Sequence, residues 1–224
     1  KIAVVSGSSY GIGEAISRKL LEKGFKVYGI SRTPAKIDDP RFVWVKADLT
    51  KPKDIDSVLS QVKEKSISLL VNNVGTAFSD EILKFSDENF EKMFSLNFKA
   101  PIKLTLALFP KLENGLIINI SSLADRFPDG LYSCSKAALN LYFEALATEN
   151  RRLRVINVLP SYVDTPMLRS LHNDDKDFSW GQTNRPEQIA EFVGYVVENP
   201  TEIESGSRVV VVSSAQDDGE YDPE

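Results

Sequence analysis

Close to the amino terminus, the sequence Val4-Val5-Ser6-Gly7-Ser8-Ser9-Tyr10-Gly11-Ile12-Gly13 gives the strongest indication of the fold. An apolar, β-branched run leads into three glycines, and an amphipathic pattern, Ile12–Glu22, follows. Glycine is needed where a backbone turns sharply or approaches a ligand without a Cβ in the way. The free N–H groups and positive dipole of a following helix make a ready site for pyrophosphate. This strand–loop–helix order therefore predicts a dinucleotide-binding α/β fold.

The glycines are spaced Gly-x-x-x-Gly-x-Gly and not as the commoner Gly-x-Gly-x-x-Gly fingerprint. Three glycines in a turn can also serve plain turn chemistry, but the strand before them and the helix after them favour the nucleotide site. The residues of this loop that we expect to bind the cofactor are Gly7, Ser9, Tyr10, Gly11, Ile12 and Gly13.

Short apolar runs alternate with amphipathic segments along the rest of the chain. The expected strands are Ile2–Ser6, Lys26–Ile30, Phe42–Ala47, Leu69–Asn72, Leu116–Ile120, Arg154–Leu159 and Arg208–Val212. The expected helices are Ile12–Glu22, ending at Gly24, then Ile55–Lys63, Glu88–Lys111 with Ser86 as N-cap, Ser133–Thr148 and Glu187–Glu198. This alternation predicts a single Rossmann-type domain over residues 1–214, with a doubly wound parallel sheet of about seven strands and helices on both faces. Residues 215–224 read as an acidic, solvated tail.

Composition excludes several classes of protein. With 224 residues, a net charge of -5 and scattered basic residues, the chain lacks the clustered Lys and Arg of a nucleic-acid binder. No apolar run approaches the ~20 residues that span a bilayer, and no His, Cys and carboxylate cluster has metal-ligand spacing. The only cysteine, Cys134, is expected to pack as a small apolar residue. A reducing compartment and the absence of a signal h-region lead us to expect a cytoplasmic protein.

The residues after the second expected strand bear on the choice of dinucleotide. A carboxylate there would bind the ribose 2′-hydroxyl of NAD, whereas an arginine accepts a 2′-phosphate. The sequence is Ser31-Arg32-Thr33, in which Arg32 can pair with phosphate while Ser9 or Ser31 adds hydrogen bonds. The alternative is that Arg32 is simply an exposed loop residue. We expect NADP(H) in preference to NAD(H).

Tyr132 and Lys136 are four residues apart, on one face of an expected helix. Proton transfer to or from an alcohol needs a group with a pKa nearer neutrality than the ~10 of tyrosine. A nearby opposite charge lowers a pKa by roughly 1–3 pH units, so the ammonium would favour phenolate. Taken alone, the pair could be a surface contact. Ser121 and Ser122 follow a strand at the expected ligand edge of the sheet, which favours an active site.

In this combination the sequence resembles the short-chain dehydrogenase/reductase family, over essentially the whole chain to about Val212. The features that match, in the family's order, are the Gly7–Gly13 loop, Asp48, Asn72-Asn73-Val74-Gly75, Asn97, Ser121-Ser122, Tyr132 with Lys136, and Pro160–Thr165. The resemblance implies an NADP(H)-dependent oxidoreductase that transfers a hydride between nicotinamide and a small carbonyl or alcohol substrate.

The resemblance also implies residue roles. Tyr132 would be the acid/base, Ser122 would orient the substrate oxygen, and Lys136 would lower the tyrosine pKa and bind the nicotinamide ribose. Asn97 would hold a proton-relay water. The remaining cofactor-binding residues would be Asp48 and Leu49 beside adenine, Asn73 and Gly75 along the crevice, and Pro160, Val163 and Thr165 near the carboxamide.

Four departures from the family pattern stand out. Ser6 replaces a threonine and Val74 an alanine, both mild changes. Ser161 replaces a glycine, which could alter the nicotinamide pocket. The gap between Ser122 and Tyr132 is shorter than usual, so Ser121 could take the place of Ser122.

The expected helices Glu88–Lys111 and Ser133–Thr148 are apolar nearly all round, so they must be covered on every side. The family pairs these helices across a two-fold axis, and we expect a homodimer or homotetramer. His172 falls in residues 169–184, which correspond to the family's substrate loop, and is expected to be a polar lid residue. Phe178 and Trp180 there would cover an apolar substrate or meet a partner.

Two other functions remain to be weighed. One is a non-catalytic NADP(H)-binding protein that senses redox state, which the intact Ser, Tyr and Lys set disfavours. The other is a sugar-nucleotide epimerase, which needs a carboxyl-terminal substrate domain for which few residues remain.

Overall fold

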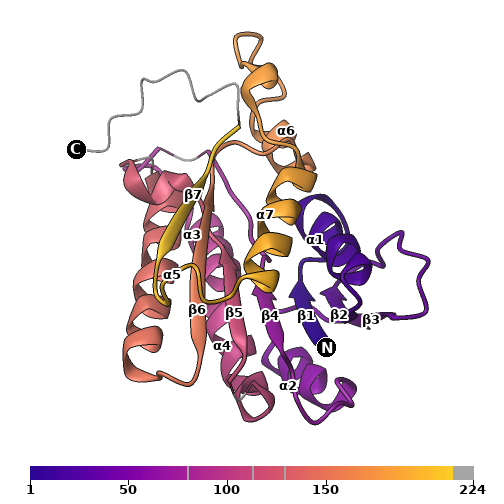
Figure 1. The fold of residues 1–224 in the computed structure, drawn as a ribbon. Coiled ribbons are helices and arrows are strands. Elements are labelled where there is room, and N and C mark those ends of the chain that lie inside the picture. Colours follow the sequence, from indigo (N-terminus) through magenta and orange to yellow (C-terminus); the bar gives the residue numbers. More distant parts are fainter. Residues whose placement is uncertain (80, 113, 129, 214–224) are drawn as a thin grey trace.

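The computed structural model describes residues 1–79, 81–112, 114–128 and 130–213. Seven parallel strands form one sheet in the order β3-β2-β1-β4-β5-β6-β7, with helices on both faces (Figure 1). The strands are β1 (Ile2–Ser6), β2 (Lys26–Ser31), β3 (Phe42–Lys46), β4 (Leu69–Asn72), β5 (Leu116–Ile120), β6 (Arg154–Pro160) and β7 (Arg208–Val211). The predicted fold class is confirmed, and every expected strand is found within one residue of its bounds.

Helices alternate with these strands. The α-helices are α1 (Gly11–Glu22), α2 (Pro52–Gln61), α3 (Asp87–Phe94), α4 (Ala100–Leu108), α5 (Gly130–Glu149), α6 (Pro166–Leu171) and α7 (Pro186–Glu198). A π-helical turn, η1 (Ser95–Lys99), and three 3-10 turns, η2 (Phe109–Lys111), η3 (Leu123–Arg126) and η4 (Trp180–Gln182), complete them. Within the described residues, no helix is long and apolar enough to cross a membrane. The predicted tail, residues 215–224, lies outside the described residues.

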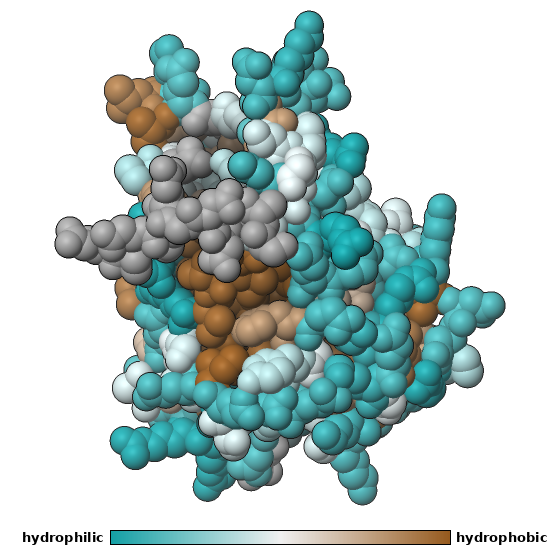
Figure 2. Space-filling model, turned by 45° about the horizontal axis from the view of Figure 1, so that its top comes forward, coloured by the Kyte–Doolittle hydropathy of each residue, from teal (hydrophilic) through white to brown (hydrophobic). Residues whose placement is uncertain are grey.

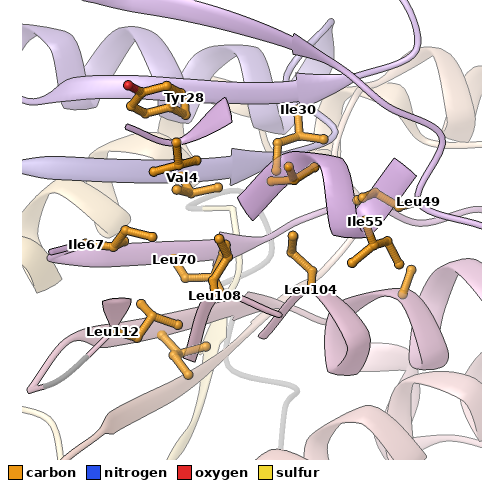
Figure 3. Packing of buried hydrophobic residues seen from close by; sticks show 14 of the residues in the cluster. Val4, Tyr28, Ile30, Leu49, Ile55, Ile67, Leu70, Leu104, Leu108 and Leu112 are labelled. Atoms are coloured by element: carbon orange, nitrogen blue, oxygen red, sulfur yellow. The ribbon is translucent and has the colours of Figure 1, made fainter. Parts of the chain in front are cut away.

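Two apolar layers cover the two faces of the sheet. On one face, α2, α4 and α5 pack over β-strand residues such as Val4 and Leu70, as Figure 3 shows for Leu104 and Leu108 of α4. On the other face, α1 and α7 cover the intervening strand residues. Because successive residues of a strand point to opposite faces, strands buried on both sides are apolar without interruption.

The strand order reverses between β1 and β4. From β1 the chain continues to β2 and β3 on one side, and it then returns to β4, β5, β6 and β7 on the other. In doubly wound sheets, ligands bind at the carboxyl ends of the strands where the order reverses. The fold therefore places Ser6, at the end of β1, and Asn72, at the end of β4, at the edge of a ligand crevice.

The expected helix Glu88–Lys111 is helical over its whole length, but it is not α-helical throughout. The chain forms α3, the π-helical turn η1, α4 and then η2. Pro101 lacks the N–H that would donate to the carbonyl of Asn97 in a regular α-helix, which gives a physical reason for the widened turn. The start is as predicted, since the Ser86 hydroxyl accepts from the amide of Asn89 at 3.1 Å.

A ladder of buried amides crosses the middle of the sheet. Asn72, Asn119 and Asn157 are partners in register on β4, β5 and β6. The Asn72 amide donates to Asn119 Oδ1 at 2.9 Å, and the Asn119 amide donates to Asn157 Oδ1 at 2.8 Å. A slip by one residue would bury these polar groups without partners, so the ladder specifies the register next to the crevice.

We predict that Asn119→Leu destabilises the protein. The leucine leaves the Asn72 amide without its shorter hydrogen bond and Asn157 Oδ1 without a donor, at about 1–3 kcal/mol for each orphaned group. Urea unfolding followed by circular dichroism measures this loss. Thr105→Val, which removes only a 3.3 Å bond to Asn72, is the control and should cost less. A variant Asn119→Leu as stable as the parent would contradict the role of the ladder.

Candidate active site

The glycine loop between β1 and α1 has the backbone that its sequence predicts. Gly7 and Gly11 have φ values of +69° and +61°, in the left-handed region that favours glycine. A Cβ on Gly13 would lie 2.2 Å from the carbonyl oxygen of Gly7, so α1 can begin against the loop only with glycine there. Tyr10 at the N-cap makes no side-chain capping bond, which leaves the first amides of α1 for another acceptor.

The end of β4 holds this loop in place. The Asn73 amide donates to the carbonyl oxygens of Ser6, at 2.9 Å, and Gly7, at 3.2 Å. In return the Ser6 hydroxyl accepts from the backbone amides of Asn73 and Val74, at 3.0 and 3.2 Å. A serine provides the same hydroxyl as the threonine that the family pattern has at this position.

Gly75, Asn97 and Lys136 come together beside the crevice. A Cβ on Gly75 would lie 3.1 Å from Asn97 Oδ1 and 3.6 Å from Lys136 Nζ. The buried Asn97 amide donates to Thr76 O at 2.8 Å and to Ser135 Oγ at 3.0 Å, and its oxygen accepts from Thr76 N at 2.8 Å. The Asn97 side chain therefore ties the β4 loop to α5.

Ser135 was missed from the sequence. It lies between Tyr132 and Lys136 on α5, is fully buried, and accepts from Asn97 while donating to Tyr132 O at 2.7 Å. A buried serine in the turn that carries the Tyr-x-x-x-Lys pair was the available signal. Cys134, expected to be packed, is exposed on α5 because the positions on either side of it take the buried face.

The side chains of Tyr132 and Ser122 lie next to each other, close enough for the Ser122 hydroxyl to lower the pKa of the phenol. Tyr132 lies in the first turn of α5, and Ser122 follows β5, where its hydroxyl also accepts from Ala124 N at 3.1 Å. The neighbouring Ser121 hydroxyl is buried and has no hydrogen-bond partner among the described residues. The geometry thus pairs Ser122, and not Ser121, with the tyrosine.

The electrostatics of this pair differ from the sequence-based expectation. Burial raises the pKa of the Tyr132 phenol, and the hydrogen bond with Ser122 opposes this rise without cancelling it. Burial also lowers the pKa of Lys136 to about 8. Lys136 Nζ donates to Ile120 O at 3.1 Å and lies 5.7 Å from the centroid of the Tyr132 ring. In the protein alone, the pKa of the phenol is therefore raised, and not lowered as the sequence led us to expect.

The end of β2 carries Arg32 as an exposed residue. Its positive charge acts on the nearby Asp48 carboxyl. Burial raises the pKa of this carboxyl. Hydrogen bonds from Thr50 and the charges of Lys51 and Arg32 outweigh burial, so the pKa lies below its usual value. Asp48 Oδ1 accepts from Thr50 N and Oγ1 at 3.1 and 2.7 Å. Leu49 next to it is buried. Arg32, expected to bind the 2′-phosphate, therefore lies near Asp48, which is expected beside adenine.

Ser31 does not fit the role considered for it. Its hydroxyl donates to Thr33 O at 2.6 Å and accepts from Trp44 Nε1 at 3.1 Å. The hydroxyl proton is therefore already used and is not free to bind a phosphate. Ser9, in the glycine loop, is only partly buried. Of the two serines weighed for the phosphate, the geometry favours Ser9.

The segment after β6 forms the other wall of the crevice. Pro160 ends β6, and the Thr165 hydroxyl caps α6 by accepting from Leu168 N at 3.3 Å. A Cβ on Gly11 would lie 3.3 Å from Thr165 Cγ2, so Thr165 faces the glycine loop. Val163 is buried and forms an isolated parallel bridge with Asn184, whose amide donates to Ser161 Oγ at 2.9 Å. Ser161 thus supports this wall.

Aromatic rings gather in the segment that follows. The Phe178 ring centroid lies 3.9 Å from that of His172, 5.2 Å from Tyr162 and 4.7 Å from Trp180. His172, expected to be a polar lid residue, is half-buried in this stack, with its Nδ1 3.3 Å from Asp175. The sequence placed these aromatic residues in one loop but did not show that they pack on each other.

A dinucleotide fits these groups, because the glycine loop offers amides without a Cβ in the way. In the part of the chain that the structure describes, no three His, Cys, Asp or Glu side chains gather as a metal site.

The comparisons with known proteins agree with this geometry. The family model described as short chain dehydrogenase matches residues 1–176. An uncharacterized oxidoreductase of Staphylococcus epidermidis is 30% identical over 220 residues, covering 91% of this chain and 93% of the relative. Dehydrogenase/reductase SDR family member 11 of Bos taurus is 29% identical over 238 residues, covering 92% and 93%.

Among solved structures, a short chain dehydrogenase family protein from Francisella tularensis superposes with a TM-score of 0.85. It is 26% identical and covers 94% of this chain and 96% of its own. The chain therefore belongs to the short-chain dehydrogenase/reductase family of oxidoreductases, which bind a nicotinamide cofactor.

Proposed function

We propose that this protein is an NADP(H)-dependent carbonyl reductase or alcohol dehydrogenase in which Tyr132 is the acid/base. The observation that carries the proposal is the contact of Tyr132 with Ser122, next to the buried Lys136, at the carboxyl end of β5. One site then holds a proton donor, a group that orients an oxygen, and a cation. A non-catalytic sensor has no need of this arrangement. The lone cysteine fits a reducing compartment, and a cytoplasmic location stays a prediction.

Each residue has a separate task in reduction. Bound NADPH supplies the hydride. The Ser122 hydroxyl donates a hydrogen bond to the carbonyl oxygen, and the Tyr132 phenol gives its proton to that oxygen as charge develops there. Since burial raises the phenol pKa, Tyr132 is protonated at neutral pH, as reduction requires. In oxidation Tyr132 must first lose its proton, and the nearby Lys136 ammonium stabilises the phenolate when charged.

We predict that Tyr132→Phe lowers kcat by about 100- to 10,000-fold, because the proton donor is lost while the ring still packs. The assay is NADPH oxidation with a panel of diketones and quinones, and NADPH fluorescence should report unchanged cofactor binding. In the parent enzyme, alcohol oxidation should rise with pH and carbonyl reduction should fall above the raised phenol pKa. Unchanged turnover of Tyr132→Phe would refute the role of the phenol, and no turnover by the parent would favour the sensor.

The preference for NADP(H) rests on Arg32. It is exposed where β2 ends, and Asp48, the carboxylate that its charge reaches, is engaged by Thr50. A guanidinium there pairs well with a 2′-phosphate, whereas the ribose hydroxyl of NAD would find no free carboxylate on Ser31–Thr33.

We predict that Arg32→Ala weakens NADPH binding by roughly 10- to 150-fold, the value of a charge-assisted hydrogen bond of about 1.5–3 kcal/mol, and leaves NADH binding nearly unchanged. Titration of each dinucleotide measures the two affinities. Arg41→Ala is the matched control, because Arg41 is an exposed arginine in the same β2–β3 connection, paired with Asp39. Equal losses for NADPH and NADH would contradict the assignment.

We also propose that two copies of the chain pair through α4 and α5. Leu106 and Phe109 on one helical segment, and Leu141 on α5, are 53%, 43% and 65% exposed. Rows of aromatic and aliphatic side chains border an open groove along α3, η1 and α4; these are Phe90, Phe94, Phe98 and Ile102. Exposed apolar area of this kind is typical of a contact surface.

A second apolar area would suit a tetramer. β7 is a strand at the edge of the sheet, its residues Val209–Val211 are only partly buried, and Val212 beyond it is exposed. Figure 2 shows one face of the molecule, where an apolar area interrupts a mostly hydrophilic surface. Strands at the edge of a sheet promote association.

We predict that Leu141→Glu converts the protein to smaller species in sedimentation velocity, because a carboxylate cannot be buried in an apolar contact without cost. Leu83→Glu, at a leucine that is 92% exposed in the loop before α3, should leave the assembly unchanged. A parent protein that sediments as a monomer would rule out the pairing.

A further inference from the structure

The short connection from Ser122 to Tyr132 contains a buried carboxylate that the proposed reaction does not use. Asp125 belongs to η3, the turn that starts at Ser122, and its side chain is fully buried. A buried charge is costly unless it is paired and hydrogen-bonded. The contacts of Asp125 therefore show what the turn is anchored to.

Asp125 Oδ2 receives two donors from different elements. Asn140 Nδ2, on α5, donates at 2.8 Å, and Arg208 Nη1, on β7, donates at 2.9 Å. The same guanidinium pairs with both carboxylate oxygens of Glu144 through its other nitrogens, with Nη2 at 3.0 Å. Because a guanidinium is planar and carries several donors, Arg208 can bind Glu144 and Asp125 at the same time through different nitrogens.

Ser122 is bound to the same turn. Its hydroxyl accepts from Ala124 N at 3.1 Å, and its carbonyl accepts from Asp125 N at 3.3 Å. A displacement of Asp125 would thus displace Ser122. Asn140 lies on the helix that carries Tyr132 and Lys136, so Asp125 joins the serine turn to the helix of the other two residues.

We propose that Asp125, held by Asn140 and Arg208, is a positioning residue that sets the placement of Ser122 relative to Tyr132. The inference rests on the proposed function, since it assigns Asp125 a role in the same reaction. It also gives a reason why the short connection can hold Ser122 beside the phenol: the ion pair of a buried carboxylate with Arg208 fixes the turn in place of a longer loop.

The test compares Asp125→Asn with Glu144→Gln. Asp125→Asn keeps the shape but weakens the contact with Arg208, and Glu144→Gln perturbs the same guanidinium without touching the serine turn. We expect Asp125→Asn to lower kcat for carbonyl reduction by about 10- to 100-fold, the effect of a small misplacement of a reacting group. The KM for NADPH should not change, and Glu144→Gln should keep a kcat near that of the parent. Equal kcat values for the two variants would overturn the proposal.

Two further readouts separate positioning from a general loss of stability. If Asp125 acts through Ser122, Asp125→Asn has no further effect on kcat in a Ser122→Ala background; additive losses would overturn the proposal. The Ser122 hydrogen bond lowers the phenol pKa, so the rising limb of alcohol oxidation should move to higher pH in Asp125→Asn and stay in place in Glu144→Gln. If the pH profile of alcohol oxidation does not shift in Asp125→Asn, the positioning role is also contradicted.

Circular dichroism checks that each variant is folded. If Asp125→Asn does not fold, Arg208→Lys takes its place, since lysine keeps the charge but cannot bind Asp125 and Glu144 as one fork, and the same comparison in the Ser122→Ala background decides. Tyr132→Phe distinguishes a failure of the positioning role from a failure of the proposed function. Loss of turnover in Tyr132→Phe together with a parent-like Asp125→Asn would refute the positioning role alone, whereas full turnover in Tyr132→Phe would refute the proposed function.

Discussion

Hydrogen bonds between the ends of β1 and β4 hold the crevice together. The Asn73 amide donates to the carbonyls of Ser6 and Gly7, and the Ser6 hydroxyl accepts from two successive amides after β4. These strands are neighbours where the strand order reverses, so the bonds fix the glycine loop where a ligand can reach it. Gly13 then brings α1 against the loop, at a distance that excludes a side chain.

A second set of contacts holds the catalytic candidates on the other side of the crevice. Asn97 and Ser135 bind the β4 loop to α5, while Asp125 and Arg208 bind the serine turn to α5 and β7. The candidate groups are thus supported by polar contacts that leave the Tyr132 phenol and the Ser122 hydroxyl side by side. Preorganised groups of this kind act on a developing charge without reorganising first.

Several features could be predicted from the sequence because they depend on local pattern. Uninterrupted apolar runs mark strands that are covered on both faces, and Ser86 marks a helix start through its own hydroxyl. Some expectations needed correction because the pattern does not show which face of a helix is buried or which partners a side chain finds. Cys134 is exposed although it lies between buried residues, and the helix that contains Pro101 widens into a π-helical turn. Ser31 was considered for phosphate, but Trp44 and Thr33 occupy its hydroxyl.

A few neighbouring residues are enough to predict the alternation of strands and helices, the glycine loop and the spacing of Tyr132 and Lys136, since hydrophobic period and glycine placement act over short stretches of chain. Three further features depend on the tertiary structure: which serine lies beside the phenol, how burial shifts the phenol pKa, and the contact of Asp125 with Arg208 across 83 residues of chain. The physical reason is that desolvation and pairing of a buried charge depend on every group that surrounds it, and the sheet brings those groups from distant segments.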